Sequence, residues 1–349
     1  MSDFCPFVVF GPSKSGTTWL QKSLDAHPDL RCHFQLPVFF FEDGGRQLAV
    51  RGRAVFSALR SPFRELFEGE EEARYWVRLR YFQRLRPLLE REVRELAERH
   101  AEAAHPDLLR ETLLETYRAL AERFLQDVPG KKHYGTKATT DLDFFFELYP
   151  QGKVVGIVRD GRDVAVSKRF HMQRRGAYYH GDEKKRWLYL LNHYRPTRLL
   201  VKALQKRFGW FGENHYRTYE SGNMRFVPSA LKKFATDWKL TVEYLLDHKR
   251  QRPAQVMLVR YEDLKQNQSE TLRRIFEFLE VPAGDAVLQA VIAATDFRKL
   301  KKKSGGDSFF RKGASGDWKN YFSGKDKTLF KKIAGELLIE LQYAEDLNW

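Results

Sequence analysis

Short runs of apolar residues alternate along this chain with longer stretches in which apolar residues recur every three or four positions. Residues 6–11 form such a run, PFVVFG, which ends at Gly-Pro and predicts a buried strand. Residues 16–26, GTTWLQKSLDA, place Trp19, Leu20 and Leu24 on one side, which predicts the helix that follows. A strand followed directly by a helix is the repeating unit of α/β proteins.

The same alternation returns further along the chain. Two more apolar runs, KVVGIVR at 153–159 and QVMLVR at 255–260, predict strands, and a helix beginning near DGRDVAVSKRF is expected after the first of them. Further helices are predicted at 229–249 and 269–279. We therefore expect an α/β fold with a mostly parallel central sheet and helices on both faces. Ligands in such folds bind at the carboxyl ends of the strands.

Two stretches interrupt this alternation. Residues 46–128 carry Leu, Val and aromatic residues every three or four positions, with Arg and Glu between them, which predicts a helical insertion. Residues 174–228 are basic, aromatic and rich in turn residues. No internal repeat or low-complexity tract marks a boundary. Residues 1–349 are therefore expected to form one domain with these two insertions.

The composition narrows the class of ligand. The chain has 61 Lys and Arg residues against 46 Asp and Glu, a net charge of +15, which favours nucleotides, nucleic acid, acidic glycans or an anionic membrane surface. The two cysteines, Cys5 and Cys32, have neither metal-binding nor redox spacing. We find no signal-peptide pattern and no apolar stretch long enough to span a membrane. A cytoplasmic protein is the expectation.

The segment GPSKSGTTWLQ at 11–21 joins the first predicted strand to its helix, where backbone N–H groups and a helix N-terminus attract phosphate. Gly11 and Gly16 are spaced as in G-x-x-x-x-G, but Thr17 stands where nucleotide triphosphatases have a lysine. The lysine of this loop, Lys14, comes before the second glycine. The loop therefore predicts a ligand other than the β- and γ-phosphates of ATP or GTP.

A second segment, VVGIVRDGRDVAVS, also carries residues that suit an anion. Arg159 ends a predicted strand and Ser167 follows eight residues later, so both can reach one phosphate. Arg162 has the same capacity. Its neighbours Asp160 and Asp163 are equally typical of a solvated helix with salt bridges.

A third segment, FFRKGASGDWKNYF at 309–322, combines Arg311 and Lys312 with two glycines in a short loop. Three anion-binding segments indicate a ligand with more than one separated anionic group. Together they resemble the sulfotransferases that use 3′-phosphoadenosine 5′-phosphosulfate (PAPS). GPSKSGTTWLQ is similar to their 5′-phosphosulfate loop, IVRDGRDVAVS to their 3′-phosphate motif, and RKGASGDWKNYF to their C-terminal Arg-Lys-Gly segment. RYEDL at 260–264 and ATDF at 294–297 also follow the order of this family.

The resemblance implies a P-loop-nucleotidase-like fold of the cytosolic and bacterial sulfotransferase type, with PAPS as co-substrate, 3′-phosphoadenosine 5′-phosphate (PAP) as product, and no metal. It implies that the 5′-phosphate is held by Lys14, Ser15, Gly16, Thr17 and Thr18. It implies that the 3′-phosphate is held by Arg159, Ser167, Arg311, Lys312 and Gly313. It implies contacts to adenine from Trp19, Tyr261, Thr295 and Phe297. A lone tryptophan at a helix start, such as Trp19, is also typical of a core residue.

Two lysines are the candidates for stabilising charge during the reaction. Sulfuryl transfer proceeds in line, and negative charge builds on the bridging oxygen that leaves. The resemblance implies that Lys14 stabilises this oxygen and that Lys137, in YGTKATTDLDFF, reaches the sulfuryl group from the neighbouring strand end. The pattern around Lys137 is as typical of an ordinary surface lysine.

The residue that accepts the proton of a hydroxyl acceptor is not in either of the usual places. Cytosolic relatives have a His where this chain has Thr139. Glycan sulfotransferases have a Glu where this chain has Gln35 and Leu36, in QLPVFFFE. His33, beside that stretch, is the first candidate base and Asp141 is the second. The further candidates are Glu42, His133 and His171. An amine acceptor or substrate-assisted chemistry would weaken the need for a base.

The sequence thus predicts a sulfotransferase that moves a sulfuryl group from PAPS to a hydroxyl or amine of a small-molecule, lipid or carbohydrate acceptor, as a monomer or homodimer. Residues 33–45 and 170–220 are the expected walls of the acceptor site. One alternative is a P-loop kinase or nucleotide triphosphatase, which the displaced lysine disfavours. The other is a non-catalytic basic protein that binds glycans or nucleic acid, which would explain the charge but not three anion loops in family order. No nucleic-acid partner is therefore expected.

Overall fold

The computed structural model describes residues 4–34, 128–137, 141–174, 226–296 and 315–349, together with several positions between 114 and 126. The predicted insertions at 46–128 and 174–228 lie outside the described residues except near their ends. The described positions between 114 and 125 are helical.

Five parallel strands form the central sheet, in the order β2-β3-β1-β4-β5. Their bounds are β1 Phe7–Phe10, β2 Leu30–Phe34, β3 His133–Lys137, β4 Lys153–Val158 and β5 Val256–Arg260. The central strand β1 pairs with β3 on one side and β4 on the other. After β3 the chain crosses to the far side of β1, so the sheet order changes direction between β1 and β4. This is the place where open parallel sheets bind ligands.

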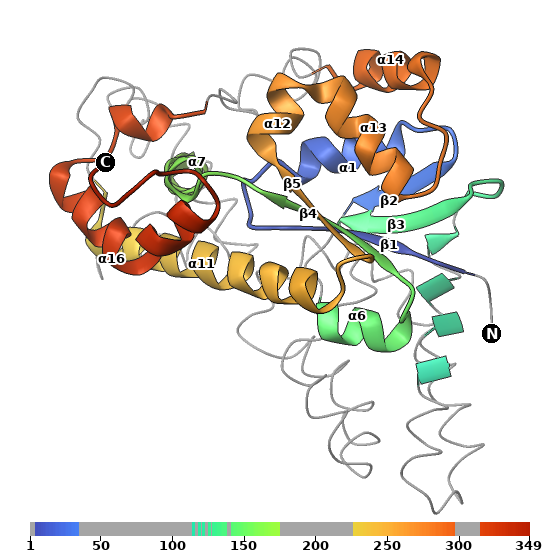
Figure 1. The fold of residues 1–349 in the computed structure, drawn as a ribbon, viewed down its shortest axis with the longest axis horizontal. Coiled ribbons are helices and arrows are strands. Elements are labelled where there is room, and N and C mark those ends of the chain that lie inside the picture. The colour runs from blue at the N-terminus through green and yellow to red at the C-terminus, as the bar shows by residue number, and fades with distance from the viewer. Residues whose placement is uncertain are drawn as a thin grey trace, which may run out of the picture.

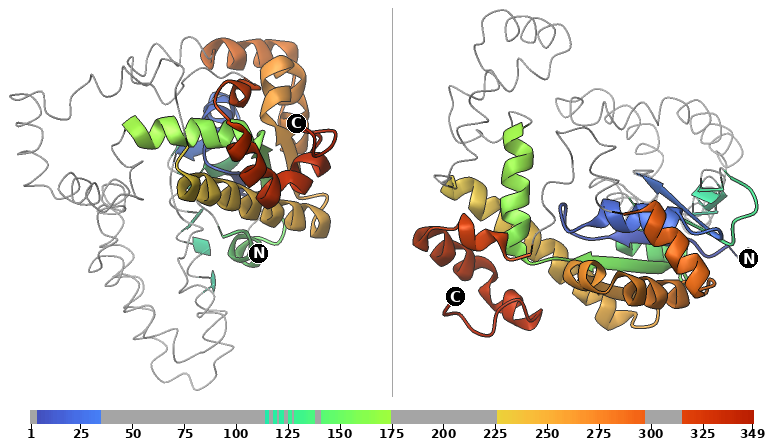
Figure 2. Two further views of the ribbon diagram at one scale, coloured as in Figure 1. Left: turned by 90° about the vertical axis from the view of Figure 1, so that its left-hand side faces the viewer. Right: turned by 90° about the horizontal axis from the view of Figure 1, so that it is seen from above.

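Alternation along the strands divides the apolar side chains between the two faces of the sheet. Phe7 and Val9 pack on one face with α1 (Thr17–Asp25), α13 (Gln268–Phe278) and α14 (Asp285–Ala294). Val8 and Phe10 pack on the other face with four helices. These are α6 (Leu142–Leu148), α7 (Gly161–Arg174), α11 (Pro228–Gln251) and α16 (Gly324–Glu340). The three layers are visible in Figures 1 and 2.

The helices on both faces begin at residues suited to a helix start. Pro228 occupies the first turn of α11, where its missing N–H costs nothing. Ser323 and Asp326 form a reciprocal capping box at the start of α16. The short α12 (Tyr261–Gln266) follows β5 directly, and a 3-10 helix, η1 (Asp317–Asn320), precedes α16. Both α7 and α16 gather at the end of the molecule where β4 leaves the sheet, as Figure 1 shows.

The predicted architecture is confirmed: the sheet is parallel and helices cover both of its faces. The strands predicted at 6–11, 153–159 and 255–260 are β1, β4 and β5. The sequence did not reveal β2 or the full extent of β3, because LRCHF and HYGTK contain no continuous apolar run. Both lie at one side of the sheet and are only partly buried. Among the described residues, no helix is long and apolar enough to cross a membrane.

Candidate functional site

The loop between β1 and α1 is closely packed against the neighbouring strand ends. Gly16 has φ +94°, and a Cβ placed on it would lie 2.5 Å from Cδ2 of Tyr261, so only glycine fits here. Lys14 also has a positive φ, +77°, which is uncommon for a residue with a side chain. The carbonyl of Gly16 accepts hydrogen bonds from the N–H groups of Trp19 and Leu20, which begins the helix. The loop therefore curls directly into the N-terminus of α1.

Two hydroxyl groups in this loop lack partners within the part of the chain that the structure describes. They are Oγ of Ser15, a fully buried residue, and Oγ1 of Thr18, which is 5% exposed. Gly16 gives α1 no side-chain cap. The helix N-terminus and two hydroxyl donors thus face the same loop, an arrangement that suits a phosphate. These residues fit the 5′-phosphate group that the sequence implied.

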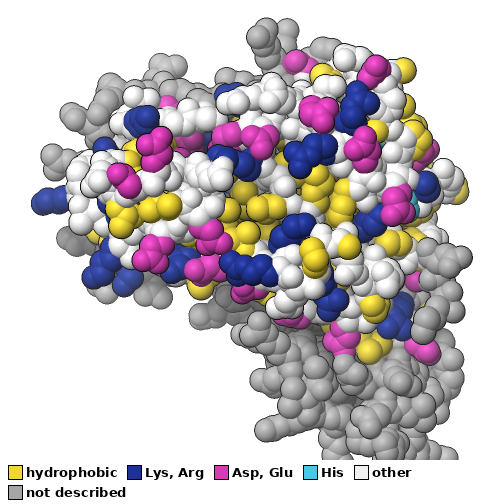
Figure 3. Space-filling view, in the orientation of Figure 1, with side chains coloured by type: hydrophobic (Ala, Val, Ile, Leu, Met, Phe, Trp, Pro, Cys, Tyr) yellow, Lys and Arg dark blue, Asp and Glu magenta, His cyan; other side chains and the backbone are white. Residues whose placement is uncertain are grey.

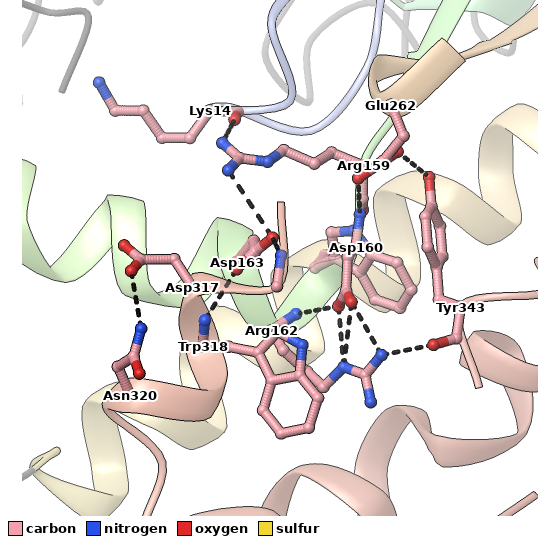
Figure 4. A network of polar contacts seen from close by, with 12 residues as sticks. Lys14, Arg159, Asp160, Arg162, Asp163, Glu262, Asp317, Trp318, Asn320 and Tyr343 are labelled. Atoms are coloured by element: carbon pink, nitrogen blue, oxygen red, sulfur yellow. Dashed lines mark hydrogen bonds and ion pairs between the residues drawn. The ribbon is translucent and has the colours of Figure 1, made fainter. Parts of the chain in front are cut away.

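Arg159 connects the loop to the end of β4. Its Nη1 donates to the carbonyl oxygen of Lys14 at 3.3 Å, and its guanidinium lies over the Tyr261 ring, 4.6 Å from the centroid. Its Nη2 lies 3.8 Å from Oδ2 of Asp163. Figure 4 shows Arg159 between the loop and Asp163, while the Lys14 side chain extends away from this network. The structure therefore places Arg159 beside the loop, and its role toward a 3′-phosphate stays a prediction.

Two further predicted polar residues stand on β3 and α7. Lys137 is the last residue of β3, next to β1 in the sheet, and its Nζ lies 4.9 Å from the ring centroid of Phe34. Phe34 ends β2 and is 44% exposed. Ser167 lies on α7 and is half-buried. Lys14 thus follows β1 and Lys137 ends the adjacent strand β3, so both lie at the carboxyl edge of the sheet.

The residues expected around adenine pack against one another. Trp19 is 4% exposed, and its Nε1 donates to the backbone oxygen of Thr295 at 3.1 Å. The rings of Trp19 and Tyr261 meet edge to face at 6.0 Å. Burial raises the pKa of the Tyr261 phenol, with Arg159 opposing this. Trp19 is therefore a core residue in this structure, and its role toward a base stays a prediction.

Arg162 has a different role from the one that its position suggests. Its guanidinium forms a bidentate pair with Asp160, with Nη2 at 2.8 Å from Oδ2, and also donates to the backbone oxygen of Tyr343. It lies against Trp318 and Trp349, 4.0 and 4.4 Å from their ring centroids, and the two rings meet edge to face at 5.2 Å. These residues form a buried network rather than the solvated helix that the sequence pattern also allowed. Arg162 is thus committed to packing the C-terminal segment.

The same network contains residues that the sequence did not single out for the site. Glu262 accepts hydrogen bonds from the backbone N–H of Asp160 and from the Tyr343 hydroxyl, and burial raises the pKa of its carboxyl. Asp163 accepts from the backbone N–H groups of Gly316 and Trp318. The sequence drew attention only to Asp160 and Asp163, because Glu262, Gly316 and Trp318 lie far away along the chain.

The candidate bases have distinct surroundings. Nε2 of His33 lies 2.8 Å from the backbone oxygen of Leu125. Asp141 caps α6 by accepting from the N–H of Phe144. His133 begins β3, so it lies at the amino edge of the sheet, away from the loop, where burial lowers its pKa. A partly buried His171 stands near the end of α7.

The remaining predicted positions lie outside the described residues: Gln35, Leu36, Glu42, Thr139, Phe297, Arg311, Lys312 and Gly313.

Charges on the described surface are mixed. On the face shown in Figure 3, Lys and Arg side chains alternate with Asp and Glu over the same elements. No group of three or more His, Cys, Asp or Glu side chains among the described residues is arranged to hold a metal ion.

Comparisons with known proteins identify the family. Residues 6–209 match the sulfotransferase family, and residues 145–342 match the sulfotransferase domain. The chain is 38% identical to sulfotransferase 6B1 of Danio rerio over 94 residues, 24% of this chain and 32% of that protein. It is 27% identical to sulfotransferase 1B1 of Canis lupus familiaris over 185 residues, 49% of each protein. The chain thus spans half or less of the length of these two relatives.

A solved structure of mouse sulfotransferase SULT7A1 complexed with PAP is 18% identical and covers 97% of this chain and 84% of that chain, with a TM-score of 0.46. The two family matches each extend over more than half of the 349 residues and between them include the loop, Arg159 and the C-terminal segment. The chain belongs to the sulfotransferase family.

Proposed function

We propose that this protein transfers a sulfuryl group from PAPS to a hydroxyl or amine acceptor and releases PAP. The observation that carries the proposal is the contact of Arg159 with the loop of Lys14, beside two buried hydroxyls that have no partner among the described residues. A single adenosine bisphosphate has two phosphates to occupy two such neighbouring anion sites. Membership of the sulfotransferase family supports the same ligand.

The chain's own residues divide the task of binding and charge stabilisation. Ser15, Thr18 and the N-terminus of α1 bind the 5′-phosphate, and Arg159 with Ser167 binds the 3′-phosphate. When bound, PAPS supplies the sulfuryl group and a phosphate leaving group. Lys14 and Lys137 hold positive charge at the edge of the sheet, where the transferring group would lie. This division needs no metal ion, and we propose that binding is independent of Mg²⁺.

His33 remains our proposed base for a hydroxyl acceptor. Because only an N–H can bond to a carbonyl oxygen, the contact with Leu125 assigns the proton of the neutral ring to Nε2. Nδ1 is then the acceptor nitrogen, which is the state that a general base requires. Asp141 is less suited, because its carboxylate already caps α6. The exposed ring of Phe34 beside Lys137 supports an acceptor with an apolar part, such as a small aromatic molecule or a lipid.

Calorimetry tests this proposal. We expect PAP to bind far more tightly than AMP, ADP or ATP, with the same affinity in Mg²⁺ and in EDTA. Arg159→Ala should remove about 1.5–3 kcal/mol of PAP binding and leave AMP binding nearly unchanged. The matched control is Arg250→Ala, which lowers the net charge equally at an exposed position on α11. Equal affinity for PAP and AMP, or tight binding of ATP only with Mg²⁺, would refute the proposal.

Catalysis is tested separately with labelled PAPS and a panel of phenols, lipids and sugars. Transfer of label to any acceptor, lost in Lys14→Ala, is the expected result. The rival function, a basic protein that binds glycans or nucleic acid through charge, predicts an affinity for heparin or oligonucleotides that falls steeply with salt. It also predicts equal losses in Arg159→Ala and Arg250→Ala.

A further inference from the structure

A buried carboxylate stands directly behind the proposed 3′-phosphate site. Asp163, in the first turn of α7, is 1% exposed. Its Oδ2 accepts the backbone N–H of Gly316 at 2.7 Å and lies 3.8 Å from Nη2 of Arg159, and its Oδ1 accepts the backbone N–H of Trp318 at 2.9 Å. Figure 4 shows this carboxylate between the arginine and the 3-10 helix.

A carboxylate in this position is unfavourable in two ways. Burial removes it from water and raises its pKa, with Arg159 and the two N–H groups acting in the opposite direction. It also places a negative charge beside an arginine that is proposed to bind a phosphate, which weakens the attraction of that arginine for an anion. A carboxylate that is unfavourable in both respects is expected to have a compensating role. The groups that contact it indicate what this role is.

The groups around Asp163 come from two segments that are far apart along the chain. Arg159 follows β4, whereas Gly316 is separated from Asp163 by 153 positions. The hydrogen bonds to Asp163 thus tie the part of the sequence that follows the Arg-Lys-Gly segment to the strand end that carries Arg159.

Resting on the proposed function, we infer that Asp163 is a positioning residue for 3′-phosphate recognition. It orients the guanidinium of Arg159 toward the 3′-phosphate and fixes the Gly316–Trp318 backbone beside it. Asp163 itself does not touch the nucleotide. Its contribution is to the discrimination between PAP and AMP, which differ only in the 3′-phosphate.

An amide cannot replace this carboxylate. Two backbone N–H donors and the Arg159 guanidinium face its two oxygens, and an asparagine offers one acceptor oxygen and one NH₂ group. Either orientation of the amide sets its NH₂ against an N–H donor, so at least one of the three contacts is lost. Asp163→Asn therefore preserves the size of the side chain while removing at least one of these contacts.

The test compares Asp163→Asn with Asp160→Asn, a matched control in the same turn. Asp160 is also buried and also pairs with an arginine, but its partner is Arg162, which packs against the tryptophans. Calorimetric Kd values for PAP and AMP are measured at a temperature where thermal unfolding shows every variant to be folded. We expect Asp163→Asn to weaken PAP binding by about tenfold and AMP binding by less than twofold. Asp160→Asn should lower the midpoint of unfolding without changing the ratio of the two Kd values.

Each other result has a defined meaning. If the wild-type chain prefers PAP and Asp163→Asn keeps the full preference or binds PAP more tightly, the inference is overturned and the proposed function stands. If the wild-type chain does not prefer PAP, the proposed function fails and the inference fails with it. An equal loss of preference in Asp160→Asn would also overturn the inference, because it would reflect general loosening. Should Asp163→Asn not fold, Asp163→Ser removes the charge without a clashing NH₂ and is expected to lose the same preference.

Discussion

The carboxyl ends of β1 and β4 are neighbours in the sheet, yet the polar side chains that follow them differ in whether the protein supplies their partners. After β1, the hydroxyls of Ser15 and Thr18 are buried and have no partner among the described residues. After β4, the guanidinium of Arg162 is paired with Asp160 and packed against Trp318 and Trp349. The hydroxyls after β1 are thus available to a ligand, whereas Arg162 after β4 is occupied by the protein itself.

The difference separates binding from support. A buried hydroxyl without a hydrogen bond costs roughly 1–3 kcal/mol in mutational experiments, and a ligand that bonds to it recovers this cost. A buried ion pair holds its segment in one arrangement, and removing one partner leaves a charge in a poorly hydrated place. Changes at the β1 end should therefore affect binding, whereas changes at Arg162 should affect stability.

The largest expected effect is on stability, at Arg162. Arg162→Ala leaves the Asp160 carboxylate without its partner and opens a space beside the two indole rings, so we expect a loss of about 3–5 kcal/mol in the free energy of unfolding. Urea denaturation followed by tryptophan fluorescence measures it. PAP affinity of the folded variant should change by less than the stability does. A loss of PAP binding with unchanged stability would mean that Arg162 belongs to the phosphate site after all.

The double variant Asp160→Asn, Arg162→Met provides the control for that experiment. Methionine keeps an unbranched side chain against the two tryptophans, and asparagine removes the buried charge. The double variant should therefore recover a large part of the stability that Arg162→Ala loses.

A smaller and opposite effect is expected at the β1 end. Ser15→Ala and Thr18→Val remove hydroxyls that bond to no described residue, so the unliganded protein should be as stable as the wild type or slightly more stable. PAP affinity should fall by about 0.5–1.5 kcal/mol for each variant. Thermal unfolding with and without PAP measures both quantities in one experiment. Lower stability without ligand would show that these hydroxyls are already satisfied inside the protein.

The smallest expected effect is a pH dependence from Glu262. Burial raises the pKa of this carboxyl, so ionisation is less favourable in the folded state than in the unfolded state. The contribution of this group to stability is therefore fully present below its unfolded pKa and is lost as the pH rises through its folded pKa. The stability of the wild type relative to Glu262→Gln should thus increase as the pH is lowered from 7 to 4. If this relative stability instead fell as the pH was lowered, the hydrogen bonds from Asp160 and Tyr343 would outweigh burial in setting the pKa of Glu262.

The parts of the site that the sequence predicted are those built from neighbouring residues. The loop at 11–21 and its helix form a continuous strand-turn-helix unit, so spacing alone located it. Arg159 could be placed because it ends an apolar run. Trp19 could be assigned either to the core or to the ligand, and its burial among distant residues was needed to show that it packs in the core.

The amino-acid sequence by itself determined the α/β alternation, the displaced Lys14 and the position of Arg159 at a strand end, because each is fixed by residues a few positions apart. Only the tertiary structure decided that Arg162 supports the C-terminal segment while Arg159 faces the loop, and that Asp163 bonds to Gly316 and Trp318. The two arginines stand three positions apart, one on each side of a turn into α7. Their different roles follow from which distant groups the fold packs against them.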